Sequence, residues 1–287
     1  MTDPVRAIAD AVLYEGYVLW PYRRSALKNQ RRWTFGGVFP EAHSARHPDD
    51  RCLVRAECLL EGDPRDVEIT VRFLHVVRRD VEEGADLVAW DEAAERELGP
   101  GRIDIPAGSE RDGPIVRSWE ALTGAITVRS AHVEPGVVSM TVEIANSTPW
   151  EADDREESLR RTFCSTHAVL RAARGRFVSQ ADPPERLRTS AEACRNEGLW
   201  PVLVDDEVVL ASPIILEDRP RIAPASPGDL FDGGEIDQLL ALNILALTDD
   251  EKAEMRAADP RTRAILERTE ALTPEQLMRL HGRTVRT

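Results

Sequence analysis

The stretch RCLVRAECLLEGDPRDVEITVRFLHVVRR, residues 51–79, carries the strand patterns that decide the fold. Apolar and polar residues alternate through 67–73, which is the period of a strand with one buried face. The tetrapeptide Glu-Gly-Asp-Pro at 61–64 is typical of a turn. We therefore predict strands at 51–60 and 66–79 that pair as a hairpin.

Further strand patterns follow along the chain. Residues 122–133 and 137–146 are joined by Glu134-Pro135-Gly136 and predict a second hairpin. The other strand candidates are residues 167–179, 200–204 and 208–215, the last two on either side of an acidic turn. Strand runs separated by short turns predict a central antiparallel sheet, built from hairpins or arranged as a sandwich.

Helical patterns lie at both ends. Residues 4–14 follow Asp3 and begin with proline, a favoured helix start, and their apolar residues recur at helical spacing. Thr248 with Glu251, and Thr273 with Gln276, fit capping boxes. The expected fold class is therefore α+β, with an N-terminal helix and a C-terminal helical tail.

We expect two parts of unequal size. Residues 1–228 form the body with the antiparallel sheet. Residues 229–287 form a C-terminal segment of three short helices, which packs on the body or on a partner.

Composition narrows the classes of function. The 287 residues include 37 basic and 51 acidic ones, and the net charge of −14 argues against general binding to nucleic acid or anionic membranes. The longest uncharged run, 238–248, is far shorter than the ~20 residues of a membrane helix. Four cysteines are too few for a disulfide framework, and the N-terminus lacks the pattern of a secretory signal. We expect a cytoplasmic protein without membrane insertion.

A basic, aromatic stretch lies near the N-terminus. Residues 20–39 hold five basic residues and no acidic residue. Arginine and aromatic side chains dominate interface hot spots, and guanidinium groups also clamp carboxylates or phosphates. Three interpretations are open: an internal match to the chain's own acids, a protein-binding site, and a site for single-stranded nucleic acid or a small anion. The candidate partner-binding residues here are Trp20, Tyr22, Arg23, Arg24, Lys28, Arg31, Arg32 and Trp33.

Acidic residues concentrate between 205 and 237, around the sequence SPGDLFDGGEID. Carboxylates can bind a hard cation or supply acid–base chemistry, but this spacing does not match a calcium loop. Acids are also favoured at helix N-termini without any ligand. The candidate residues of this cluster are Asp218, Asp229, Asp232 and Glu235.

Histidine and cysteine suggest two further sites that the geometry disfavours. His43, His47, Cys52 and Cys58 invite a zinc interpretation, but the two cysteines of one strand would lie roughly 20 Å apart. Cys164 and His167 resemble a nucleophile and base, yet no nucleophile-elbow motif surrounds them. We therefore predict no catalytic residue, metal ligand or cofactor.

Two segments resemble a known family. YEGYVLWPYRRSALKNQRRWTFGG at 14–37 and residues 211–282, which include SPGDLFDGGEID, resemble a little-characterised bacterial family encoded in gene clusters for nickel–iron (NiFe) uptake hydrogenases. Members are regarded as accessory or assembly proteins with no assigned reaction. The chain departs from the family's pattern at 217–220, which reads Glu-Asp-Arg-Pro, and at Gly233-Gly234.

The resemblance implies a non-catalytic accessory or assembly protein of a NiFe hydrogenase, which binds a hydrogenase subunit or maturation factor. The segments 20–37 and 217–247 are the expected contacts. The alternative is a carboxylate- or metal-dependent enzyme that uses the acidic cluster, and the choice between an enzyme and a binding protein leans towards binding. A third interpretation is a small-anion binder that uses the arginines of 20–39.

Charge reversal at Arg31 and Arg32 tests the basic stretch. If these residues contact a partner, the double change to Glu weakens partner capture and shifts the melting temperature by only a few degrees. Thermal unfolding and affinity capture, measured on the same preparations, decide between the interpretations. A large loss of stability would show that the two arginines match acids of the same chain.

Overall fold

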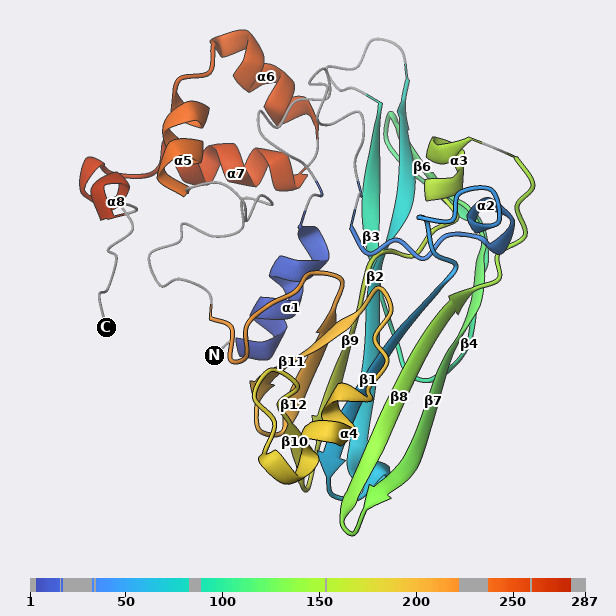
Figure 1. Ribbon diagram of the computed structural model, residues 1–287. Helices are drawn as coiled ribbons and strands as arrows, with labels where there is room; N and C mark the ends of the chain where they lie inside the picture. The colour runs from blue at the N-terminus through green and yellow to red at the C-terminus, as the bar shows by residue number, and fades with distance from the viewer. Residues whose placement is uncertain are drawn as a thin grey trace.

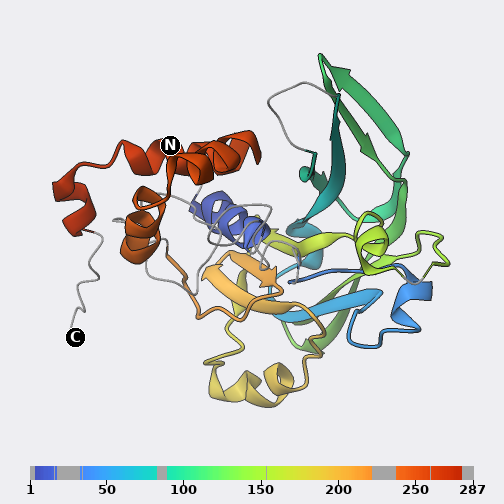
Figure 2. The ribbon, with the colours of Figure 1, turned by 90° about the horizontal axis from the view of Figure 1, so that it is seen from above.

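The computed structural model describes residues 4–15, 17, 33, 35–82, 89–152, 154–221, 237–258 and 260–279. Two antiparallel sheets face each other, and α1 and the C-terminal helices lie to one side of them (Figures 1 and 2). The α+β class is confirmed.

Each sheet has a defined strand order. The first sheet runs β10 (Arg176–Val178), β1 (Leu53–Glu61), β8 (Val137–Asn146), β7 (Leu122–Glu134) and β4 (Gly101–Ile105). The second runs β11 (Trp200–Asp205), β12 (Val208–Ser212), β9 (Cys164–Ala172), β2 (Val67–Val81), β6 (Ile115–Trp119) and β5 (Gly108–Asp112). β3 (Trp90–Leu98) pairs with the other edge of β2.

The hairpin predicted for residues 51–79 is wrong. β1 belongs to the first sheet and β2 to the second, and a 3-10 turn at Pro64–Asp66, capped by Asp63, carries the chain between them. Both strands bury side chains in the same core from opposite sheets. Alternation specifies which side chains are buried, but it does not specify which neighbouring strand receives the hydrogen bonds.

The remaining strand predictions are confirmed in part. Residues 122–133 and 137–146 form a hairpin, β7 with β8, as expected. Residues 200–204 and 208–215 also pair, as β11 with β12. The run at 167–179 divides into β9 and β10, which lie in different sheets. β3 was not predicted, because its sequence WDEAAEREL is charged on both faces.

The N-terminal helix agrees with its prediction, since α1 spans Pro4–Tyr14. Short helices follow at α2 (Glu41–Ser44), α3 (Arg155–Leu159) and α4 (Arg188–Glu192). Within its described residues, 237–258 and 260–279, the C-terminal segment holds four helices where three were expected: α5 (Asp237–Leu245), α6 (Asp249–Ala258), α7 (Pro260–Glu270) and α8 (Pro274–Arg279). Both capping boxes form, with reciprocal bonds between Thr248 and Glu251 and between Thr273 and Gln276.

The main core lies between the two sheets. Val71 and Phe73 of β2 face Met140 and Val142 of β8 across it, all with side chains shielded from water. The ring of Phe73 stacks on Phe163, with centroids 4.7 Å apart. Burial of such side chains stabilises by roughly 1.5–3 kcal/mol each, so this layer supplies much of the free energy of folding.

The second sheet is buried on its outer face as well. Leu74 and Val76, on the opposite face of β2 from Val71 and Phe73, pack in a second core with Ile244 of α5 and Ile265 of α7. α1 lies along β9 and β12, where Val5, Ile8 and Val12 meet Val169 and Leu210. A strand covered on both faces reads as a near-continuous apolar run, which explains the composition of residues 67–77.

Buried arginines tie the helical layer to β2. Arg79 donates to Glu92 at 2.9 Å and to the carbonyls of Ala257 and Ala258 at the end of α6. These contacts give the last carbonyls of α6 a cationic partner, which is favoured at a helix C-terminus. Arg79 therefore fixes α6 over the β2–β3 pair.

The substitution Arg79→Met tests this tie. It leaves the carbonyls of α6 without their buried cation, whereas Glu92 keeps a hydrogen bond from Arg117 at 2.7 Å. We therefore expect the free energy of unfolding to fall by about 2 kcal/mol. Arg78→Met is the matched control, because Arg78 is the neighbouring arginine and is half-exposed beside Asp80. Its cost is expected to stay below about 1 kcal/mol. Urea unfolding of both variants measures the difference, and equal losses would contradict the assignment.

Candidate functional site

The two segments that carry the family resemblance come together in the fold. Tyr17 and Trp33 share the second core with Leu240 of α5 and Leu266 of α7. The guanidinium of Arg261 lies 3.5 Å from the centre of the Tyr14 ring. The described residues of the two segments are thus neighbours on the outer side of the second sheet, although the 173 residues from 38 to 210 separate the segments in sequence.

The predicted site residues are described only in part. Trp33 is buried, with 4% of its surface exposed, and it packs in the second core. The following predicted residues lie outside the described ranges: Trp20, Tyr22, Arg23, Arg24, Lys28, Arg31, Arg32, Asp229, Asp232 and Glu235. For them the sequence interpretation stays a prediction.

Asp218 lies at the open edge of the second sheet, beside β11. One carboxylate oxygen accepts the Leu203 N–H at 2.9 Å, and the other accepts the hydroxyl of Ser179 at 2.6 Å. The N–H of Arg219 donates to the Leu203 carbonyl. Asp218 and Arg219 therefore satisfy backbone groups of an edge strand that would otherwise be free to pair with another chain.

These contacts define a surface that we call the edge strip, residues 213–221. The strip starts after Ser212, which pairs with Trp200 at one end of β11, and passes Leu203 on the strand's open side. It ends beside Asp205, at the other end of β11. A proline in this strand, Pro201, is the sequence signal of an edge position, because proline cannot donate to a neighbouring strand.

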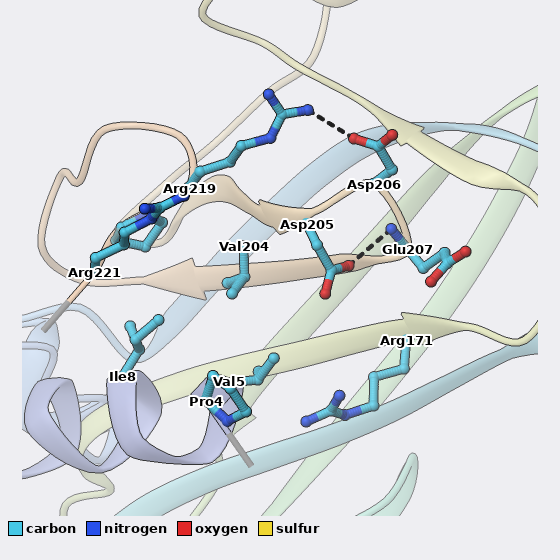
Figure 3. A pocket seen from close by; sticks show the side chains of 11 residues that line it. Pro4, Val5, Ile8, Arg171, Val204, Asp205, Asp206, Glu207, Arg219 and Arg221 are labelled. Atoms are coloured by element: carbon cyan, nitrogen blue, oxygen red, sulfur yellow. Dashed lines mark hydrogen bonds and ion pairs between the residues drawn. The ribbon is translucent and has the colours of Figure 1, made fainter.

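A pocket of about 640 Å³ opens where the edge strip meets α1 (Figure 3). Val5 and Ile8 of α1 and Val204 of β11 give it an apolar floor. Figure 3 shows Arg219 and Arg221 on one side and Arg171 reaching from β9 towards the start of α1. Sequence reasoning missed this pocket because its residues come from four separate segments.

The rim of the pocket mixes both signs of charge. Arg219 pairs with Asp206 at 2.8 Å, and both side chains are mostly exposed. The carboxylate of Asp205 accepts the N–H of Glu207 at 2.9 Å, which shapes the turn between β11 and β12. Such a site can hold an apolar side chain on its floor and exchange surface ion pairs with the flanking residues of a bound chain.

Large apolar side chains are exposed at the opposite end of the edge strip. Ile215 is 75% exposed, Phe35 43% and Trp200 38%. Trp200 pairs with Ser212, and Gly36 lies so close to Pro213 that an added Cβ would meet its ring at 2.6 Å. Phe35, Trp200 and Ile215 therefore come from segments that meet at the turn after Ser212. Exposed apolar groups gathered in this way mark interaction surfaces.

The histidine and cysteine candidates are accounted for by packing. His43 lies 2.8 Å from Asp50 and stacks on Phe39. Cys164 and His167 are both fully buried in β9, out of reach of a substrate. Within the described ranges, no group of three or more His, Cys, Asp or Glu side chains could hold a metal ion.

No family model matches the chain. No curated protein matches it either. Among the helices described, none combines the length and apolar composition that crossing a membrane requires.

Two buried histidines make stability depend on pH. Burial lowers the pKa of His167 to about 3, helped by the nearby Arg72, and burial with Arg96 lowers the pKa of His75 to about 4. Both are neutral in the folded protein, whereas the unfolded chain takes up protons below its usual pKa of ~6.5. The unfolded state then binds more protons, so stability falls as pH falls from ~6.5 towards 4.

Urea unfolding between pH 7 and pH 5 measures this loss, since ordinary carboxylates titrate mostly below that window. We expect His75→Gln and His167→Gln each to reduce the slope of stability against pH. His132→Gln provides the control, because His132 is exposed on β7 and belongs to neither buried core. An unchanged slope in the two buried variants would contradict the account.

Proposed function

We propose that this protein is a non-catalytic accessory protein of a NiFe hydrogenase, which binds a hydrogenase subunit or a maturation factor through the edge strip. The observation that carries the proposal is the meeting of the two segments with the family resemblance. Phe35 comes from the first, Ile215 from the second, and both border the turn after Ser212. The partner's identity rests on the resemblance alone.

The chemistry of the edge strip fits protein binding. Its exposed apolar side chains include a tryptophan, the residue type most often found at binding hot spots. Full burial of an exposed apolar side chain contributes roughly 1.5–3 kcal/mol. Ile215 would add most of that amount on binding, whereas Phe35 and Trp200, which are already more than half buried, would add less than half of it. The pocket at the other end adds an apolar floor with a charged rim. A protein chain that spans the strip could therefore contact both ends.

The mode of action follows from this surface. Binding would cover an apolar region of a hydrogenase subunit before assembly and release it when the mature partner arrives. Such a role needs no reacting group, and it requires that binding be reversible. A few apolar side chains would supply most of the binding free energy, because the exposed ion pairs around them contribute little to it. Such a surface suits reversible binding.

The enzyme alternative depends on the acidic cluster. Of its four carboxylates, Asp218 is described, and hydrogen bonds within the chain occupy both of its oxygens. Asp229, Asp232 and Glu235 lie outside the described ranges, so the alternative stays open for them. Metal analysis of the purified protein discriminates, because a stoichiometric divalent ion would favour the enzyme.

Affinity capture from the native host tests the proposal. The tagged full chain should recover hydrogenase subunits or maturation factors, and the double variant Trp200→Ser/Ile215→Ser should recover at least tenfold less. A tenfold loss corresponds to about 1.4 kcal/mol, less than the expected contribution of the two side chains. Quantitative mass spectrometry of the eluates gives the ratio.

Val133→Ser serves as the matched control. Val133 is another large exposed apolar residue, 38% exposed, but it lies on β7 in the first sheet and outside both expected contact segments. Its variant should recover the partner as the natural chain does. Equal recovery by the double variant would remove the edge strip from the proposal, and eluates without any hydrogenase component would overturn the proposed function itself.

A further inference from the structure

An irregularity in β11 shapes the pocket beside α1. The register of β11 against β12 shifts between Leu203 and Asp205, so Val204 is an extra residue without a partner in β12. Successive side chains of a regular strand point to opposite faces, and a bulge interrupts that alternation. Val204 and Asp205 both line the pocket. The bulge therefore places an apolar and a charged side chain next to each other at one site.

The floor of the pocket consists of apolar side chains that are nearly buried. Val5 and Ile8 line it, with exposed fractions of only 5% and 8%. Val204 packs against the same apolar cluster. The volume of about 640 Å³ lies within the range of sites for small molecules. A group bound on this floor would contact aliphatic side chains of both α1 and β11.

Two charged side chains of the rim make no ion pair with any described residue. The carboxylate of Asp205 accepts the N–H of Glu207 through one oxygen, and no described cation pairs with it. The guanidinium of Arg221 likewise has no ion-pair partner within the described ranges. In the view of Figure 3, Val204 of the floor lies between these two side chains. The apolar floor is thus bordered by one available anion and one available cation.

The other charged residues of the rim contribute less to the floor. Arg219 and Asp206 pair with each other at 2.8 Å, so their charges are compensated within the rim. Figure 3 shows the side chain of Glu207 directed away from the floor, and Arg171 reaching towards the start of α1. Asp205 therefore supplies the carboxylate of the site, and Arg221 supplies its guanidinium.

We propose that this pocket binds a small zwitterion with an aliphatic side chain, either a free amino acid such as leucine or a dipeptide of such residues. The carboxylate of Asp205 binds the ammonium group of the ligand, and the guanidinium of Arg221 binds its carboxylate. The aliphatic side chain lies on the apolar floor, where its burial adds to the affinity. A ligand with a single charge would pair with only one of the two rim groups.

An NMR titration of the purified full chain with leucine and with Leu-Leu tests the ligand class. At least one of them should bind with a Kd of about 1 mM or below, given the free energy that small ligands gain per atom. The better ligand identifies the preferred length. Its N-acetylated form lacks the ammonium and its amide lacks the carboxylate, so each should bind at least tenfold more weakly. The proposal fails if neither ligand binds at about 10 mM, or if both modified forms bind as well as the parent.

Asp205→Asn and Arg221→Gln test the two rim groups separately. Asparagine keeps an oxygen that can accept the N–H of Glu207, so the turn between β11 and β12 is preserved. Each change should raise the Kd at least tenfold. Asp104→Asn is the matched control, because Asp104 is an exposed carboxylate on β4 of the first sheet, and its variant should bind as the natural chain does. Unchanged binding in either pocket variant, or an equal loss in the control, would contradict the assignment.

Val204→Ser tests the floor through selectivity. Serine removes an aliphatic contact and leaves both charged groups in place. The natural chain should prefer leucine to glycine, or Leu-Leu to Gly-Gly, and the variant should lose most of that preference. A preference that stays unchanged would exclude the floor as the site of the aliphatic group. These titrations need no hydrogenase partner, so their outcome is separate from that of the proposed function.

Discussion

The whole architecture depends on β2 being buried on both faces. One face, with Val71 and Phe73, closes the core of the sandwich, and the other, with Leu74 and Val76, supports the helical layer. Because the strand lies between two cores, neither layer can form fully without it. The helices at both chain ends therefore have a fixed platform, and the edge strip is positioned by the same sheet through β9 and β12.

Buried arginines between β2 and the helices help to select one arrangement of the helices. Arg72 is almost fully buried between α1 and β3, where Asp10 and Glu95 are its ion-pair partners. Arg79 performs the same task for α6. Buried ion pairs contribute little net stability when compared with apolar packing, but breaking one is costly. They therefore favour one arrangement of the helices over others that would bury as much apolar surface.

The edge strip combines exposed side chains with a closed backbone edge. It offers apolar side chains beside a sheet edge that Asp218 has already closed. The proposed partner would therefore contact side chains of the strip, because the backbone groups of Leu203 are already bonded within the chain.

The sequence by itself determined the fold class, the N-terminal helix, both capping boxes and one of the two predicted hairpins, because these follow from local periodicity and turn chemistry. It could not place β1 and β2 in different sheets, since alternation specifies a buried face and not a pairing partner. Only the tertiary structure decided that Trp33 is core, that Asp218 closes a strand edge, and that Phe35, Trp200 and Ile215 gather at one turn. Such neighbours come from distant segments, and no local pattern records the long-range packing that joins them.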